Sequence, residues 1–245
     1  MMKDLKIAVL IDGDNIPSKY ISEMMEEITK YGTPTVKRIY GDWTKPHLAK
    51  WKNVLLENAI SPVQQYSYTT GKNATDSAMI IDAMDILYSN KVDAFCLASS
   101  DSDFTKLATR LREAGLQVFG IGEKKTPDPF IVACDKFIYL EILKSSTDKL
   151  DGDVKTKQQN LYNITPKVVR MLKNSVSDAA DDDGWAFLGD VGSLILKKQP
   201  NFDPRNFGFE KLTPLFKSLD VFEMEQRDQS NGRFKLIYVK NKKTN

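Results

Sequence analysis

The sequence predicts an α/β protein, in which a parallel sheet flanked by helices is followed by a smaller α+β unit. Two apolar runs without polar alternation, Ile7 to Ile11 and Ala94 to Ala98, are typical of parallel strands covered on both faces. Strand-like and helix-like segments alternate from the first run to about residue 143, which indicates right-handed βαβ connections. From Lys144 to Asn160 the apolar pattern stops, and a different arrangement follows.

The first part is predicted to contain strands and helices of ordinary length. Helical apolar spacing, such as that of Ile21, Met24 and Ile28, marks each helix, and Gly32 with Pro34 ends the first one. The predicted strands cover residues 7–11, 36–40, 62–66, 94–98 and 116–121. The predicted helices cover residues 18–31, 47–58, 75–88 and 104–114, and a last pass runs through 129–133 and 137–143.

The second part is predicted to be an independent unit. The segment 144–160 is rich in Lys, Ser, Thr, Asp and Gln and is predicted to be a linker, so domains are expected at 1–143 and 161–245. The predicted elements are a helix starting at Thr165-Pro166, apolar segments at 185–196 and 209–219, and hairpin strands at 221–225 and 234–238. Three helices and a hairpin are the plan of a winged-helix domain.

The composition is that of an ordinary globular protein. The 245 residues are 41% hydrophobic, and 35 basic against 33 acidic residues give a net charge of +2. The balance is −2 over residues 1–143 and +4 over residues 144–245, so the excess positive charge lies in the second part. Cys96 and Cys134 lack metal-ligand spacing, no signal-like segment opens the chain, and no run reaches the roughly 20 apolar residues that span a bilayer. We therefore expect a cytoplasmic protein without membrane contact.

Carboxylates follow both buried strands. Asp12 ends the first strand, Asp101 and Asp103 follow the second, and Asp76 opens the helix predicted at 75–88. The carboxyl ends of parallel strands are where open α/β sheets bind ligands. Clustered carboxylates repel one another unless a cation lies between them, and an all-oxygen set indicates Mg²⁺ or Mn²⁺. Such an ion suits phosphodiester hydrolysis. The other interpretation is that Asp76 and Asp103 cap helices.

Further residues are candidates for substrate contacts. Lys72, on a glycine-containing loop before Asp76, could contact a backbone phosphate or be a solvated loop residue. His47 is the only histidine, and its place beside Pro46 favours a surface or capping role over a catalytic one. The aromatic residues that could stack on bases are Trp43, Trp51 and Tyr66, of which Trp51 lies on an apolar helix stripe.

Four motifs in order carry a resemblance to a known family. They are IAVLIDGDN at 7–15, GDW at 41–43, GKNATDSAMIIDAMD at 71–85 and SSDSDF at 99–104. Over about residues 5–143 the chain resembles the NYN domain of the LabA-like group within the PIN-like nuclease superfamily. The resemblance implies a metal-dependent ribonuclease in which Asp12, Asp76 and Asp101 hold the metal and take part in catalysis, with Asp103 as a supporting acid.

The same motifs hold other polar residues. Asn15, Ser99 and Ser100 are predicted to contribute to substrate binding, as is Lys72. Asp82 matches a recurrent acid of the family. It lies about 120° around the helix from Asp76, so we interpret it as an outer or surface residue.

Residues of about 161–240 resemble the OST-HTH (LOTUS) winged-helix module, which often follows NYN domains. The likeness lies in Gly184-Trp185-Ala186, in the region of Pro204 and in 209–219. It implies RNA or protein binding. We expect RNA, single-stranded, as the partner and leave a protein partner open. Lys197-Lys198 and Lys240 to Lys243 are candidates for phosphate contacts, or are simply solvated chain ends.

Two other functions are compatible with parts of the sequence. A strand followed by Asp12-Gly13-Asp14 resembles the nucleophile motif of haloacid-dehalogenase-like phosphatases, in which Asp12 would form an aspartyl-phosphate and Asp14 would act as acid and base. That family usually has Thr or Val where this chain has Ile16, which argues against it. The second alternative is a non-catalytic RNA-binding adaptor, and the sequence does not separate it from a nuclease.

Overall fold

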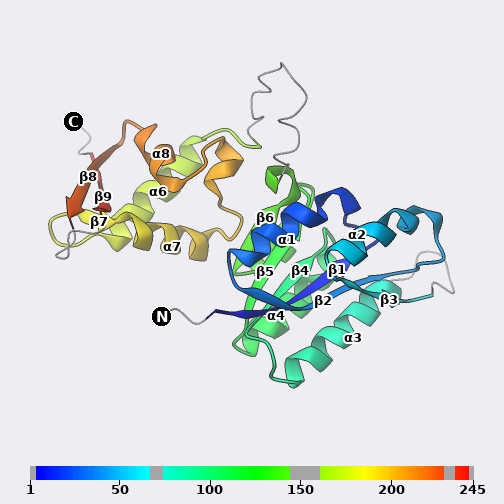
Figure 1. Ribbon diagram of the computed structural model, residues 1–245. Helices are drawn as coiled ribbons and strands as arrows, with labels where there is room; N and C mark the ends of the chain where they lie inside the picture. The colour runs from blue at the N-terminus through cyan, green and yellow to red at the C-terminus, as the bar shows by residue number, and fades with distance from the viewer. Residues whose placement is uncertain (1–3, 67–73, 144–160, 229–234, 243–245) are drawn as a thin grey trace, which may run out of the picture. The chain divides into compact units, whose positions relative to one another are not determined.

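The computed structural model describes residues 4–66, 74–143, 161–228 and 235–242. The chain divides into two compact units, residues 1–152 and 153–245, which are described separately (Figure 1). The predicted linker, 144–160, lies outside the described residues, so the domain boundaries stay predictions. Among the helices described, none is long and apolar enough to cross a bilayer.

The first unit, over its described residues, is built on six parallel strands. They are β1 (Lys6–Asp12), β2 (Thr33–Gly41), β3 (Ser61–Gln64), β4 (Ala94–Ala98), β5 (Gln117–Gly122) and β6 (Lys136–Tyr139). Their order in the sheet is β3-β2-β1-β4-β5-β6 (Figure 1). The chain moves outward from β1 to β3 and then returns to pair β4 with β1. The boundary between β1 and β4 is therefore the topological switch point, where open α/β sheets bind ligands. The predicted parallel α/β fold is confirmed.

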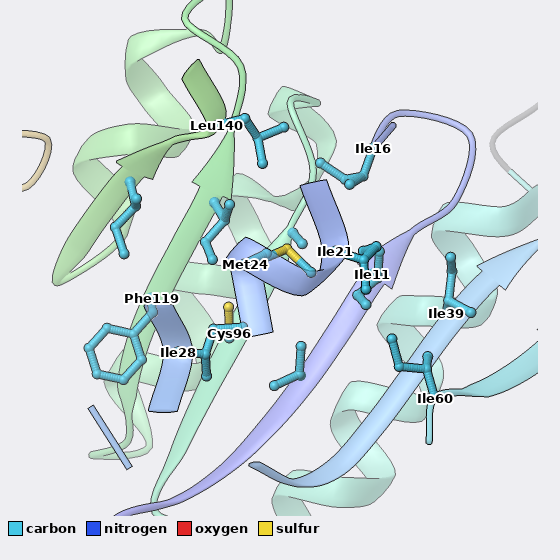
Figure 2. Close-up of a cluster of buried hydrophobic side chains, with 14 of the residues drawn as sticks. Ile11, Ile16, Ile21, Met24, Ile28, Ile39, Ile60, Cys96, Phe119 and Leu140 are labelled. Atoms are coloured by element: carbon cyan, nitrogen blue, oxygen red, sulfur yellow. The ribbon is translucent and has the colours of Figure 1, made fainter. Parts of the chain in front are cut away.

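Helices cover both faces of this sheet. They are α1 (Ile21–Thr29), α2 (Trp51–Glu57), α3 (Ala74–Tyr88), α4 (Thr105–Glu113) and α5 (Asp128–Ala133). One face packs against α1 and α2 through a cluster of buried side chains that includes Ile11, Met24 and Cys96 (Figure 2). The other face carries α3, which contacts β1 and β2, and α4, which contacts β5. Side chains alternate along a strand, so Ile11 enters the first cluster and Asp12 lies on the side of α3.

The observed starts of some elements differ from the predicted ones. The helix predicted from residue 47 begins as a 3₁₀ turn, Pro46–Lys50, and is α-helical from Trp51. A second 3₁₀ turn, Ser102–Phe104, precedes α4 because the Asp101 side chain caps the chain there. Pro34, predicted to end a helix, lies inside β2. It is tolerated there because β3 pairs with β2 further along, at residues 38–41, and leaves this edge open.

The second unit, over residues 161–228 and 235–242, has three α-helices and an antiparallel sheet. The helices are α6 (Pro166–Ala179), α7 (Leu188–Lys198) and α8 (Leu212–Lys217), and the strands are β7 (Trp185–Phe187), β8 (Phe222–Asp228) and β9 (Lys235–Asn241). The order β7-β9-β8 adds a third strand to the predicted hairpin. The apolar segment predicted at 185–196 divides into β7 and α7, because its first three residues pair with β9. Helices α6 and α7 contact β9 and share a core that includes Leu172, Val191 and Val239.

Candidate metal centre

The switch point brings the ends of β1 and β4 together. Ile11 pairs with Ala98, so Asp12 and Ser99 are the next residues on two neighbouring strands. Ser99 Oγ donates a hydrogen bond of 2.7 Å to Asp12 Oδ2. The backbone N–H of Asp101 donates one of 3.1 Å to the same Ser99 hydroxyl. Ser99 thereby links the acid at the end of β1 to the acid that follows β4.

Asp12 is a buried carboxylate held in one orientation. Only 1% of the residue is exposed. In addition to the Ser99 bond, Asn15 Nδ2 donates to Oδ2 at 2.6 Å and the backbone N–H of Asp14 donates to Oδ1 at 3.2 Å. Burial raises the pKa of Asp12, and the three hydrogen bonds offset this rise only in part. A carboxylate has about four lone-pair positions, so these three hydrogen bonds do not use all of those of Asp12.

Asp101 and Asp103 occupy the turn that follows β4. Asp101 Oδ1 accepts a hydrogen bond of 2.9 Å from the backbone N–H of Asp103. Asp101 is therefore the capping residue of the turn, a role that sequence reasoning had weighed for Asp103. Asp101 is partly exposed and Asp103 is exposed, so both can present a carboxylate oxygen to solvent and ligands.

Asp76 completes the cluster from the first turn of α3. One carboxylate oxygen from each of Asp76, Asp101 and Asp103 lies within 4.8 Å of the others. The pKa of Asp76 is raised to about 6, first because burial disfavours its charge. Negative neighbours then raise the pKa further, in the order Asp12, Asp101, Asp103 and Asp14. The site thus concentrates negative charge around one point, and this repulsion is what a bound cation would relieve.

The donor atoms fit a hard divalent cation. Mg²⁺ takes oxygen ligands at about 2.0–2.1 Å, so ligand oxygens on opposite sides of it lie about 4 Å apart. The oxygens of the observed group lie within 4.8 Å of one another, near that spacing, and its all-carboxylate chemistry suits Mg²⁺ or Mn²⁺. Sequence reasoning had chosen Asp12, Asp76 and Asp101 as ligands, whereas the group contains Asp103 in place of Asp12. Among the neighbouring charges, that of Asp12 raises the pKa of Asp76 most, which indicates that Asp12 lies beside the group.

The other polar residues of the motifs support the acids or the nearby loop. Asn15 and Ser99 both donate to Asp12. Ser100 is buried, and its Oγ accepts a hydrogen bond of 2.9 Å from the backbone N–H of Glu123, which follows β5. Substrate contact by Asn15, Ser99 and Ser100 stays a prediction.

The aromatic candidates have different surroundings. Trp51 is 3% exposed and packs in the core, as its place on an apolar stripe predicted. Trp43 is partly buried, and its Nε1 donates a hydrogen bond of 3.0 Å to a β3 carbonyl. Tyr66 is 52% exposed. Lys72 and the side chain of His47 lie outside what the structure describes.

Sequence reasoning gave Asp14 no place among the metal ligands and missed Thr75. Thr75 Oγ1 donates a hydrogen bond of 3.3 Å to Asp14 Oδ2, so the loop after β1 is tied to the first turn of α3. The sequence held a signal for both residues, since Asp14 lies two residues beyond Asp12 and Thr75 directly precedes Asp76. The hydrogen bond between Thr75 and Asp14 therefore holds the end of β1, with Asp12, near the start of α3, with Asp76.

Asp82 anchors α3 to the sheet. Its carboxylate accepts hydrogen bonds from the guanidinium of Arg38 and the hydroxyl of Tyr40, both on β2. Tyr40 is buried, and its pKa is raised above the usual range, first by burial and then by Asp82. Asp82 therefore holds in place the helix that carries Asp76, and its partners turn it away from the cluster of acids.

Comparison with protein families finds two matches. The family model described as the NYN domain matches residues 6–141, more than half of the chain. The model described as the OST-HTH/LOTUS domain matches residues 160–234. The first match indicates a PIN-like nuclease family and the second an RNA-binding module. Both resemblances drawn from the sequence motifs are confirmed.

Solved structures with similarity to parts of this chain come from three bacteria. The first is a protein of unknown function from Vibrio parahaemolyticus, at 20% identity and TM-score 0.48, covering 56% of this chain and 93% of that chain. The second is an uncharacterized protein from Nitrosomonas europaea, at 30% identity and TM-score 0.31, covering 42% and 92%. The third is a protein from Chromobacterium violaceum, at 31% identity and TM-score 0.26, covering 31% and 82%. The search of curated proteins found no match.

Proposed function

Because the chain belongs to the NYN domain family, we propose that it is a metal-dependent endoribonuclease. The observation that supports this most strongly is the group of Asp76, Asp101 and Asp103, with carboxylate oxygens within 4.8 Å of one another at the switch point of the sheet. Burial first, and then the charges of the neighbouring acids, raise the pKa of Asp76 to about 6. A divalent cation and the phosphate it binds are the natural partners of such a site.

The acids have distinct roles in this proposal. Asp76, Asp101 and Asp103 would hold the ion, and the buried Asp12 would add negative charge beside them. Asn15 and Ser99 keep Asp12 in one orientation. When bound, the ion supplies neutralisation of phosphate charge and activation of the attacking water. We assign the orientation of that water to Asp76, because a carboxylate with a pKa of about 6 can accept a proton near neutral pH.

The substrate and the location follow from other parts of the chain. We propose single-stranded RNA as substrate, held in part by the OST-HTH/LOTUS domain, and leave a protein partner of that domain open. Cys96 and Cys134 are both free and buried, which suits the reducing cytoplasm.

The test compares cleavage by wild type and by Asp101→Asn. Labelled single-stranded RNA, single-stranded DNA and duplex RNA are incubated with each protein in Mg²⁺, Mn²⁺ or EDTA. Wild type is expected to cleave single-stranded RNA only with the metals, and the variant should be at least about 100-fold slower, since metal stabilisation of phosphate charge is worth several kcal/mol. Asp85→Asn is the matched control, because Asp85 is an exposed acid on the same helix as Asp76.

Each contrary outcome has a definite meaning. Cleavage that survives both EDTA and the Asp101 substitution would come from a contaminating nuclease. RNA binding without cleavage of any substrate would favour the adaptor. A phosphatase acting on small phosphomonoesters through Asp12 is disfavoured by the burial of that side chain and by the hydrogen bonds that both its oxygens accept.

A further inference from the structure

One face of the three-stranded sheet in the second unit carries large apolar side chains. Residues opposite each other on antiparallel strands share a face, as do alternate residues along a strand. Trp185 lies opposite Lys240, Phe187 opposite Tyr238, and Arg227 opposite Leu236. We call the surface formed by Trp185, Phe187, Arg227, Leu236, Tyr238 and Lys240 the ring face.

The ring face lies opposite the buried face of the same sheet. That other face contributes Ala186, Phe222 and Val239 to the core of the unit, together with side chains of the helices. Antiparallel sheets with one solvated face normally place polar residues on it. Here all three aromatic rings and Leu236 are partly exposed on the solvated face. A need to fill the core does not explain them.

Two cations lie over these rings. The Cζ atom of Arg227 is 4.3 Å from the ring centroid of Tyr238 and 5.3 Å from that of Trp185. The Nζ atom of Lys240 is 5.9 Å from the ring centroid of Trp185. The rings of Phe187 and Tyr238 are 5.9 Å apart, centroid to centroid. The ring face therefore places the aromatic rings of Trp185 and Tyr238 next to the positive charges of Arg227 and Lys240.

Arg227 and Lys240 can both form further interactions. Arg227 pairs with Glu225 at 3.4 Å and with Asp183 at 3.8 Å, and both of these acids are about half exposed, at 48% and 58%. Ion pairs of this length and exposure contribute little to stability. Lys240 Nζ donates to the Asp183 carbonyl at 2.5 Å, and an ammonium group has two further protons to offer. A phosphate can therefore replace the ion pairs of Arg227 at small cost, and Lys240 can contact one while it keeps its bond to the Asp183 carbonyl.

We propose that the ring face binds single-stranded RNA. Unpaired bases stack against Trp185 and Tyr238, and Arg227 and Lys240 contact the phosphates beside the stacked bases. Every base has a flat face that can stack on an aromatic ring or a guanidinium plane, so this binding tolerates different sequences. The inference rests on the proposed function, in which RNA is the substrate.

Stacking makes the ring face selective for single strands. Glu223 and Glu225 lie on the same face of the edge strand β8, opposite Lys240 and Tyr238, and they repel the phosphates of any RNA. A duplex encloses its bases and gains no stacking on the rings to offset this repulsion. A single strand meets the same repulsion but gains the stacking energy of its unpaired bases. We therefore expect single-stranded RNA to bind more tightly than duplex RNA of the same length.

The test measures RNA binding by the full chain with Asp101→Asn in every protein, which prevents cleavage. A labelled single-stranded RNA of about a dozen nucleotides is titrated against this parent, Trp185→Leu and Tyr238→Leu. Loss of one stacking ring is expected to raise Kd by about 5- to 150-fold. Trp185→Phe retains a ring and should recover most of the affinity. Tyr88→Leu removes an aromatic residue that is 68% exposed on α3 and should leave Kd unchanged.

A second measurement does not depend on how well these variants fold. The chain has three tryptophans, Trp43, Trp51 and Trp185. In Trp43→Phe/Trp51→Phe protein, RNA is expected to quench the emission of Trp185, because a stacked base contacts the indole. Arg227→Gln should reduce the slope of log K against log salt concentration by about 0.7, the value for one phosphate contact on a single strand.

Four outcomes would overturn the inference. Unchanged RNA affinity in both folded Leu variants, or an unquenched Trp185 at saturating RNA, shows that the bases lie elsewhere. Loss of affinity in Lys211→Gln/Lys217→Gln with ring-face variants unaffected would move the site to α8. Ring-face variants that bind RNA normally but lose capture of a protein would make the surface a protein interface.

The proposed nuclease activity is tested separately. If protein with Asp101 intact binds RNA through the ring face but cleaves none, the nuclease proposal is wrong and the ring-face proposal still holds.

Discussion

The acid cluster of the first unit and the ring face of the second handle charge in opposite ways. Asp76, Asp101 and Asp103 bring like charges within 4.8 Å, and the pKa of Asp76 rises to about 6 as a result of burial and these neighbours. On the ring face, Arg227 lies among rings and exposed acids of opposite charge. The acid cluster gathers charge of one sign, which a cation would offset, whereas the ring face combines charges of both signs with surface for stacking.

The acid cluster and the ring face would therefore gain their binding energy from different sources. A cation bound at the acid cluster would reduce the repulsion between the carboxylates of the folded chain. Its binding would therefore increase the free energy of unfolding. At the ring face a ligand exchanges one set of weak contacts for another, so stability should hardly depend on it. Single substitutions that remove one charge test this contrast, and the substitution expected to change stability most comes first.

The largest effect is expected at Asp82, which shares α3 with Asp76 but has two partners. Asp82→Ala leaves the buried Tyr40 hydroxyl and the Arg38 guanidinium without their acceptor. We expect a loss of about 2–3 kcal/mol in the free energy of unfolding, toward the lower end because Arg38 is 38% exposed. Urea unfolding measures this loss. Asp85→Ala, an exposed acid three residues along the helix, should change stability by less than about 0.5 kcal/mol.

The next effect has the opposite sign. Asp76→Asn removes one of the repelling charges, so the metal-free variant should be more stable than wild type by about 1 kcal/mol at pH 7, after allowance for screening. The raised pKa means that folded Asp76 binds more protons than unfolded Asp76 between pH about 4 and 6. Wild-type stability should therefore fall through this window as pH rises, relative to the variant, and stay level above it.

Metal binding should reverse the relative stabilities of wild type and Asp76→Asn. Mg²⁺ or Mn²⁺ at 100 times its Kd is expected to stabilise wild type by about 2.7 kcal/mol and Asp76→Asn by much less. Thermal unfolding with EDTA and with each metal, at pH 5 and pH 7, measures both effects. Equal stabilisation of the two proteins by metal would show that Asp76 is not a ligand. Asp85→Asn should behave as wild type throughout.

The sequence alone predicted the fold and the edge at which the acids meet. The reason is that apolar runs such as Ile7 to Ile11 and helical spacing are local signals, and parallel strands with βαβ connections align their carboxyl ends by rule. It also placed Asp12, Asp76 and Asp101 in that region. Which of these acids hold an ion stays a prediction. The close grouping of Asp103 with Asp76 and Asp101 depends on the geometry of one 3₁₀ turn, which no local pattern indicates.

Other features depend on contacts between distant residues. Strand β7 has only three residues, too few for a pattern, and is a strand because Trp185 pairs with Lys240. The anchoring of Asp82 depends on Arg38, which is 44 residues away. A Cβ at Gly122 would lie 2.5 Å from the Ser99 carbonyl oxygen, a close approach that no local pattern indicates.

The smallest effect is expected at Arg227, where the contrast with the acid cluster is tested most directly. Its ring contacts and exposed ion pairs are each worth about 0.5–1 kcal/mol or less, and they replace water contacts. Arg227→Gln should therefore cost the second unit less than about 1 kcal/mol, measured by denaturant unfolding with Trp185 emission as the probe in Trp43→Phe/Trp51→Phe protein.

Arg205 is the matched control. It pairs with the buried Asp203 through two hydrogen bonds, at 3.0 and 2.7 Å. Arg205→Gln removes both guanidinium bonds, while the backbone N–H of residue 205 still donates to Asp203 Oδ1 at 2.9 Å, and it should cost more, about 2 kcal/mol. If the two substitutions cost the same, the ring face would be a structural cluster, and the contrast between a site that needs its ligand and one that merely accepts it would not hold.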